Sequence, residues 1–333
     1  MATPVVTQRE PALYSTIANF RRARRELPVG AIVGFVPTMG ALHDGHAELF
    51  RRARLQCDVV VGSVYINPTQ FAAHEDLDRY PRQLEKDLEL LRSEGLADMV
   101  FAPGPEEMYS KDHRMYVDPV GFDDLPEGVA RPGFFRGVVT IVTKLLNVVQ
   151  PDFTYFGQKD ALQCISIKKL VADLNMPVEV VVCETRREAD GVAMSSRNAY
   201  MTEVERAAAP VVYMSLQAAA GARQRAAEAG RRASREEILA AVEAILSAQP
   251  LVRAIEYMSV GCPATMSELE EVGNAGAIVS VAVKMGPVVR LIDNIVLPPI
   301  TTPATRDDDA EVFAPTQQQP QSEDEAPTLH RQQ

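Results

Sequence analysis

Residues 31–46 read AIVGFVPTMGALHDGH, an apolar run followed by a glycine-containing loop. The run at 31–36 has no polar side chain, which is typical of a strand buried on both faces of a parallel sheet. A helix is expected directly after the loop, at 46–56. A strand that leads through such a loop into a helix begins a crossover unit, so this stretch predicts an α/β fold.

The alternation of short apolar runs and longer amphipathic segments continues along the chain. Strands are expected at 59–66, 99–102, 154–156 and 178–183, with helices from about residue 82, at 138–149 and at 161–175. Repeated units of this kind predict a doubly wound, Rossmann-like parallel sheet. Ligands of such sheets bind beyond the carboxyl ends of the strands.

The composition changes after Tyr200. An alanine-rich helical region is expected at 203–247, interrupted near Gly230, and strand-like runs follow at 254–260, 277–284 and 289–297. They predict a smaller α+β domain. We therefore divide the chain into a Rossmann-like, ligand-binding domain (1–187), a smaller C-terminal domain (188–299) and a tail (300–333). The tail is acidic and Gln-rich with few apolar residues, so it is expected to be disordered.

Charge and cysteine usage exclude several classes of protein. The 333 residues carry a formal net charge of −11, which repels phosphate backbones, so no nucleic-acid partner is expected. The 4 cysteines form no CxxC pair, which argues against a disulfide framework and a zinc site. This cysteine usage makes a reducing cytoplasm the expected location. No stretch approaches the roughly 18 apolar residues of a membrane span, so no membrane partner is expected. The arginines at 21–25 are interpreted as a solvated helix face rather than as part of a transit peptide.

The loop at 37–46 is the first candidate site. Gly40 and Gly45 have the glycine spacing of a phosphate-binding GxxxxGK[ST] loop, but His46 follows where that motif has lysine. His43 and His46 lie close together at the predicted mouth of the sheet, where imidazoles can donate hydrogen bonds to phosphate oxygens. The alternative is a tight turn with two exposed histidines.

Two further polar segments follow predicted strands. Residues 67–71 (NPTQF) place the amides of Asn67 and Gln70 at the same edge, where they suit a hydroxyl or carboxylate substrate, although a proline-centred turn would read similarly. Residues 156–163 (FGQKDALQ) bring Lys159, which can reach a phosphate as a point charge. Asp160 and Gln163 could instead cap the helix that begins there.

The last candidate segment lies at the junction of the two predicted domains, where residues 190–198 read DGVAMSSRN. The hydroxyls of Ser195 and Ser196 and the guanidinium of Arg197 can bind phosphate oxygens together. A polar helix-capping loop would look similar. Taken together, the segments favour a common site for a phosphorylated ligand.

Five stretches of the chain carry a resemblance to a known family: PTMGALHDGH (37–46), NPTQF (67–71), EDLDRYPR (75–82), FGQKD (156–160) and DGVAMSSRN (190–198). In order and spacing they resemble the pantothenate synthetase family, the pantoate:β-alanine ligases, over about 34–200 and more weakly to 297. His43 to His46 is similar to the HxGH element of the wider adenylyl-transferring superfamily. The resemblance implies that ATP and pantoate form pantoyl adenylate and pyrophosphate, and that β-alanine then displaces AMP.

The resemblance also implies roles for individual residues. His43, His46 and Lys159 would be catalytic, with His46 as proton donor in the first step. The implied pantoate and β-alanine contacts are Pro37, Thr38, Asn67, Gln70 and Gln163. The implied ATP contacts are Met39, Gly40, His43, Gly45, His46, Gly157, Lys159, Asp160, Arg186, Met194, Ser195, Ser196 and Arg197. Mg²⁺ would be bound with ATP, without metal ligands of the protein's own, in a cytoplasmic homodimer.

The chain departs from the family pattern at two positions. Phe134, expected in the loop before the helix at 138–149, stands where histidine is common, and Arg186 stands where a small apolar residue commonly contacts adenine. Two other functions stay open: another HxGH-type adenylyltransferase with a different acceptor, and a catalytically silent nucleotide-binding regulatory protein. Pantoate-dependent release of pyrophosphate from ATP separates them.

Overall fold

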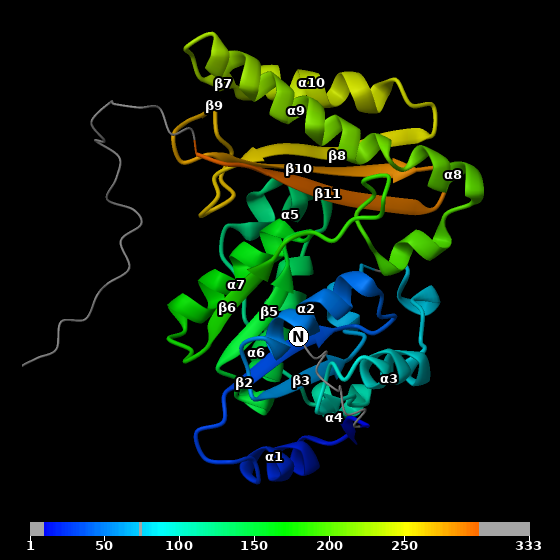
Figure 1. Ribbon diagram of the computed structural model, residues 1–333, viewed down its shortest axis with the longest axis vertical. Coiled ribbons are helices and arrows are strands. Elements are labelled where there is room, and N and C mark those ends of the chain that lie inside the picture. The colour runs from blue at the N-terminus through cyan, green and yellow to red at the C-terminus, as the bar shows by residue number, and fades with distance from the viewer. Residues whose placement is uncertain (1–9, 73–74, 300–333) are drawn as a thin grey trace, which may run out of the picture. The chain divides into compact units, whose positions relative to one another are not determined.

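The strand predicted at 31–36 forms β2 (Val33–Thr38), which lies inside a six-stranded parallel sheet of order β1-β4-β3-β2-β5-β6. The computed structural model describes residues 10–72 and 75–299, so the predicted disordered tail lies outside the described residues. The other strands of this sheet are β1 (Ala12–Tyr14), β3 (Val59–Val64), β4 (Met99–Phe101), β5 (Phe153–Gly157) and β6 (Glu179–Cys183). The predicted doubly wound sheet is confirmed (Figure 1).

Helices cover both faces of this sheet. Phe35 packs in the core shared with α1 (Ile17–Arg25), α6 (Phe134–Val149) and α7 (Ala161–Asp173). The next residue, Val36, packs on the opposite face with α2 (Asp44–Arg54) and α3 (Leu84–Ser93). Successive side chains of a strand point to opposite faces, so a strand covered on both sides needs an uninterrupted apolar run.

The order of the strands creates a switch point between β2 and β5. From β2 the chain proceeds to β3 and β4 on one side, and it later returns to place β5 and β6 on the other. The pairing between β2 and β5 joins Gly34 to Phe153 and Phe35 to Thr154, near the start of both strands. The loops that follow the two strands therefore flank a crevice, which is where ligands of doubly wound sheets bind.

Two details of the N-terminal half differ from the sequence predictions. α6 begins at Phe134 rather than at residue 138, because Gly133 adopts a left-handed conformation (φ +76°) that ends the preceding loop. Phe134 is therefore the first residue of the helix and not part of the loop. The arginine face of α1 is also not merely solvated: Arg24 donates hydrogen bonds to the carbonyls of Val149 (3.1 Å) and Gln150 (3.0 Å) at the C-terminal end of α6.

The C-terminal part contains a second sheet. The predicted alanine-rich region forms α8 (Glu203–Ala208), α9 (Val211–Glu228) and α10 (Arg235–Ser247), with the break around Gly230. β8 (Val252–Gly261), β10 (Ala277–Met285) and β11 (Val289–Leu297) form an antiparallel sheet of order β11-β10-β8, and α9 and α10 pack on one face of it (Figure 1). The smaller α+β part is confirmed, whereas the domain boundaries at 187 and 299 stay predictions.

The remaining elements are short. They are α4 (Pro105–Met108), α5 (Pro126–Ala130), β7 (Ala233–Ser234), β9 (Glu271–Val272) and the 3-10 helices η1 (Pro68–Gln70), η2 (Leu77–Arg79), η3 (Phe122–Asp124) and η4 (Ser196–Tyr200). Among the helices in the described residues, none has the length and apolar character to cross a membrane.

Candidate active site

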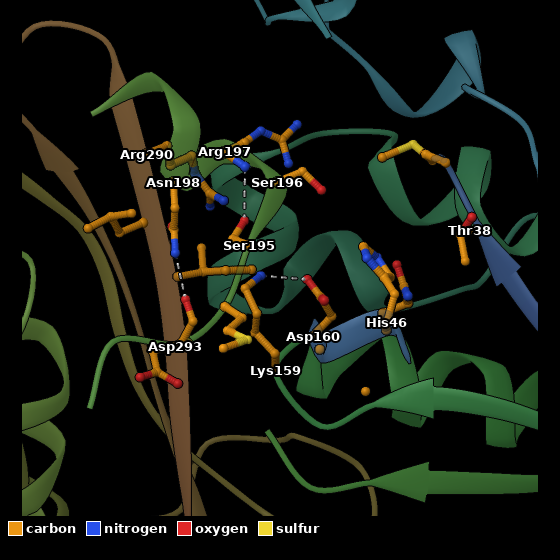
Figure 2. A pocket seen from close by; sticks show the side chains of 18 of the residues that line it. Thr38, His46, Lys159, Asp160, Ser195, Ser196, Arg197, Asn198, Arg290 and Asp293 are labelled. Carbon is orange, nitrogen blue, oxygen red and sulfur yellow. Dashed lines mark hydrogen bonds and ion pairs between the residues drawn. The ribbon is translucent and has the colours of Figure 1, made fainter. Parts of the chain in front are cut away.

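A pocket of about 530 Å³ opens at the switch point of the parallel sheet. Its walls come from the loops after β2, β3 and β5, from residues 184–200, and from β8, β10 and β11 of the second sheet. Figure 2 shows β11, with Arg290 and Asp293, on one side of this pocket and Thr38 and His46 on the other. The four polar segments found in the sequence therefore meet in one place.

The imidazoles of His43 and His46 sit at the N-terminus of α2. His43 is the N-cap residue, and its Nδ1 accepts the N–H of Gly45 (3.1 Å). The Nδ1 of His46 accepts the N–H of His43 (3.4 Å), so the two rings form a reciprocal capping box with centroids 4.1 Å apart. Because both Nδ1 atoms accept hydrogen bonds, the neutral rings carry their protons on Nε2.

Both histidines are neutral at physiological pH. Burial and the nearby charge of Lys159 lower the pKa of His43 to about 4. Burial, the His43 ring and Lys159 lower the pKa of His46 to about 3. The side chains thus present two neutral Nε2–H donors, which suits hydrogen bonding to phosphate oxygens better than proton transfer.

Asp87 of α3, which no motif in the sequence marks, shapes the loop in front of the histidines. Its buried carboxylate accepts the N–H groups of Ala41 (3.0 Å) and Leu42 (2.8 Å). Gly40 (φ +83°) is buried behind the loop, where a Cβ would come within 2.9 Å of Asp87 Oδ2. Gly40 is the one predicted ATP contact that does not line the pocket, and its role is to allow this turn. The sequence feature that could have revealed Asp87 is its place on the apolar face of a helix, where a carboxylate needs a buried partner.

The amides after β3 form a small network at the pocket wall. Asn67 is buried, and its Nδ2 donates to Gln70 Oε1 (2.9 Å) and to the carbonyl of Gly137 (3.1 Å). The Nε2 group of Gln70 is thereby left to face a ligand. Pro37, Thr38 and Gln163, the other predicted substrate contacts, also line the pocket.

Asn294 of β11 holds the loop that carries Lys159. Its Nδ2 donates to the carbonyls of Gln158 (2.8 Å) and Lys159 (2.8 Å), and its Oδ1 accepts from Gln158 Nε2 (3.2 Å). Lys159 Nζ lies 3.6 Å from Asp160 Oδ1, and both side chains line the pocket (Figure 2). The second sheet therefore fixes a loop of the first sheet.

The neighbouring Asp293 anchors the segment that leads to Ser195. Its buried carboxylate accepts two hydrogen bonds from Arg187 (2.5 and 2.9 Å), whose guanidinium also stacks on Tyr213, 3.9 Å from the ring centroid. Arg187 forms a β-bridge with Ala193, two residues before Ser195. Asp293 and Asn294 were not singled out from the sequence, because their partners lie more than a hundred residues away.

The serine and arginine segment faces the pocket from η4. Ser196 donates to the carbonyl of Ala41 (3.1 Å), which ties this segment to the histidine loop. Arg197 forms a bidentate ion pair with Asp76 (2.9 and 3.0 Å). Ser195 Oγ accepts the N–H of Arg197 (3.3 Å), and Met194 also lines the pocket.

The two departures from the family pattern have clear partners. Arg186 Nε donates to Asp44 Oδ2 (3.0 Å), so its guanidinium is held at the pocket rim. Phe134 lies under the guanidinium of Arg131, 3.5 Å from the ring centroid, and Arg131 also forms a bidentate ion pair with Glu75 (2.8 Å to each oxygen). The ring therefore positions a cation instead of supplying a proton.

A metal ion would need ligands from outside the protein. Among the described residues, no group of three or more His, Cys, Asp or Glu side chains could hold one. The pocket is also lined by the remaining predicted ATP contacts, which are Met39, Gly45, Gly157 and Asp160.

Fold and pocket define an α/β protein whose polar pocket lies at the switch point of its parallel sheet and gathers imidazole, ammonium and guanidinium groups. A family model described as pantoate-beta-alanine ligase matches residues 12–296. The chain belongs to this family and is a ligase.

Individual relatives agree with the family assignment. The chain is 50% identical over 282 residues to the pantothenate synthetase of Chloroflexus aggregans, covering 85% of this chain and 98% of the relative. It is similar to the crystal structure of pantothenate synthetase from Thermus thermophilus, with a TM-score of 0.78, 43% identity, and coverage of 86% and 100%. A pantoate-beta-alanine ligase from Francisella tularensis, complexed with beta-gamma ATP and beta-alanine, gives a TM-score of 0.70, 31% identity, and coverage of 86% and 97%.

Proposed function

We propose that this protein joins pantoate to β-alanine in two steps, using ATP to form pantoyl adenylate and releasing pyrophosphate and then AMP. The observation that carries the proposal is the meeting of two Nε2–H donors, Lys159 and an amide cluster at one switch point. Family membership and the ATP and beta-alanine complex of the Francisella relative support it.

In the first step a carboxylate oxygen of pantoate attacks the α-phosphorus of ATP. The bond from that phosphorus to the bridging oxygen breaks, and pyrophosphate leaves with the electron pair. Negative charge grows on phosphate oxygens, where the Nε2–H groups of His43 and His46 and the ammonium of Lys159 stabilise it. The pKa of about 3 makes His46 a hydrogen-bond donor here, which replaces the proton-donor role implied by family resemblance.

In the second step the neutral amine of β-alanine attacks the acyl carbon of the adenylate. The bond from that carbon to the phosphate oxygen breaks, AMP leaves with the electron pair, and the amine releases a proton to the solvent. We assign the hydroxyl and acyl groups of pantoate to Gln70 and Gln163, because amides both donate and accept hydrogen bonds, and we assign to Asn67 the positioning of Gln70. Residues of β8, β10 and β11 line this side of the pocket.

Mg²⁺ fits the residues present if it arrives with the nucleotide. Mg²⁺ retains water and phosphate ligands and commonly takes one or two carboxylates. Asp160, beside Lys159, is the carboxylate we assign to it. When bound, the ion would neutralise charge on the phosphates.

The test is an assay that resolves the two steps. We expect pyrophosphate release from ATP only with pantoate, and AMP release only after β-alanine is added. Pyrophosphate release with another acid would indicate a different adenylyltransferase of the same class. Nucleotide binding without any release would indicate a catalytically silent nucleotide-binding protein.

The assembly and location of the protein belong to the same proposal. We propose a homodimer in the cytoplasm, as the family resemblance implies. Light scattering on the full chain checks the first, and fractionation of the source cells checks the second. A monomer at micromolar concentration would contradict the dimer.

A further inference from the structure

Two cations face each other across adjacent strands of the second sheet, and neither has a role in the site described above. Lys284 of β10 is the register partner of Arg290 of β11. Like charges directly opposite each other destabilise an antiparallel pair. Both residues line the pocket, so a ligand there could make use of this arrangement.

A β-bulge brings one carboxylate to this pair. Along β8 the register passes from Tyr257 to Ile255 while β10 advances from Ala282 to Val283, so Glu256 is the extra residue. Glu256 accepts a hydrogen bond from Arg290 Nε (2.6 Å) and lies 3.3 Å from Lys284 Nζ. Burial opposes ionisation of Glu256, but the two cations hold its pKa below the usual range, so one negative charge is shared by two positive charges.

The two cations keep donor capacity for a ligand. Within the part of the chain that the structure describes, Nη2 of Arg290 is buried and has no hydrogen-bond partner. The Lys284 side chain is 60% exposed and makes a single ion pair. Glu127 of α5 also faces Arg290, but burial raises the pKa of its carboxyl, which weakens it as a second counter-ion.

Arg290 lies near the segments of the first sheet to which we assign phosphate binding. β11, which carries Arg290, packs against η4, which carries Arg197 and Asn198. Asp293, the next carboxylate along β11, is committed to Arg187 and does not neutralise Arg290. Four cationic side chains thus line the pocket: Lys159 and Arg197 from the segments after β5 and β6, and Lys284 and Arg290 from the second sheet.

We propose that Arg290 and Lys284 form a binding site for the pyrophosphate group, which is the β- and γ-phosphates of ATP before the first step and the leaving group after it. The inference rests on the proposed function and extends it by a site on the second sheet. When the bond between the α-phosphorus and the bridging oxygen breaks, the new charge appears on pyrophosphate, where these cations lie. Charge-assisted hydrogen bonds of this kind change affinity by about tenfold or more.

The experiment compares three probes by calorimetry on the full chain: pyrophosphate with Mg²⁺, ATP with Mg²⁺, and AMP. We expect Arg290→Gln and Lys284→Met each to weaken pyrophosphate and ATP about tenfold or more, and to change AMP less than about twofold. Arg253→Gln, an exposed arginine of β8 outside the pocket, is the matched control and should change none of them. Lys284 is exposed, so Lys284→Met should fold and still test pyrophosphate binding if Arg290→Gln folds poorly.

Two results overturn the inference: unchanged pyrophosphate affinity in folded Lys284→Met, or equal losses for AMP and pyrophosphate. Failure of the proposed function gives a different signature. In that case the parent chain would bind pyrophosphate through these cations and yet release none from ATP with pantoate.

Discussion

The two ring nitrogens of His46 make different hydrogen bonds. Nδ1 caps α2, and Nε2–H is left for the ligand. We predict that His46→Ala folds but forms pantoyl adenylate roughly 10²-fold more slowly or worse, because a donor to the transition-state charge is lost. Pantoate-dependent pyrophosphate release checks this, with His113→Ala, outside the pocket, as the matched control. A variant within about threefold of the parent would contradict the assignment.

Gln70 and Lys159 belong to different ligands in our assignment. Gln70→Ala should weaken pantoate about tenfold while changing ATP little, and Lys159→Ala should do the reverse, because each deletes a hydrogen-bonding or charged contact to one substrate. Titrations with each ligand measure this. Gln217→Ala and Lys168→Ala, both at exposed helix positions, are the controls. Equal losses for both ligands in both variants would contradict the partition.

Phe134 replaces a histidine that is common in the family. Its ring supports Arg131 and cannot carry a proton, so the chemistry in this chain must proceed without an ionisable group there. We predict that Phe134→His changes the turnover number by less than about tenfold, or roughly 1.4 kcal/mol of barrier. Steady-state rates between pH 5 and 9 test this. A gain of about a hundredfold, with a new ionisation near pH 6.5, would show that the natural ring impairs catalysis.

At the scale of elements, β11 connects the two sheets. Asn294 donates to two carbonyls of the loop after β5, and Asp293 holds the segment before η4. The loop that carries Lys159 and the segment that leads to Ser195 are thus positioned by adjacent residues of one strand. A displacement of about 1 Å in such a segment can lower a rate by about 10²-fold.

We predict that Asn294→Asp lowers kcat/KM for ATP by tenfold or more, because a carboxylate cannot donate to the carbonyls of Gln158 and Lys159 and repels them. The affinity for pantoate should stay within about twofold, since that ligand contacts other segments. Steady-state kinetics for each substrate separate the two effects, and thermal denaturation checks the fold. Asn147→Asp, at an exposed position of α6, is the matched control. Equal losses for ATP and pantoate would indicate general damage instead of positioning.

At the scale of the whole molecule, the sequence predicted what depends on local pattern. Apolar runs located β2, β3, β4, β5 and β6, and the convergence of parallel strand ends predicted that three of the four polar segments meet. The fourth segment, at 190–198, was expected to join them because its hydroxyls and guanidinium suit the same phosphate ligand. β1 was missed because three residues at a sheet edge carry almost no periodicity. Asp87, Asp293 and Asn294 were missed because a buried polar residue shows its purpose only with its partner, and each partner lies far away in the sequence.

The stability of the whole molecule at acid pH follows from the histidine pair. The folded pKa of His46, about 3, lies below the ordinary value of 6.5, so the unfolded chain binds a proton that the folded chain refuses between these values. The stabilising free energy that neutral His46 contributes to the folded state is fully present above pH 6.5. It is lost as the pH falls toward 3. Carboxylates with lowered pKa, such as Asp76 and Glu75, add losses only below about pH 4.5.

We therefore predict that the unfolding free energy of the parent falls between pH 7 and pH 5 by about 1 to 2 kcal/mol more than that of His46→Gln. Glutamine can still accept the N–H of His43 but does not titrate. For a chain of this size the difference in melting temperature between the two should change by a few degrees over that interval. Thermal scans at both pH values measure it, and NMR titration of the ring gives the pKa directly. A midpoint near 6.5 in the folded protein would contradict the prediction, because His46 would then be an ordinary solvated imidazole and no longer the neutral donor that the proposed first step requires.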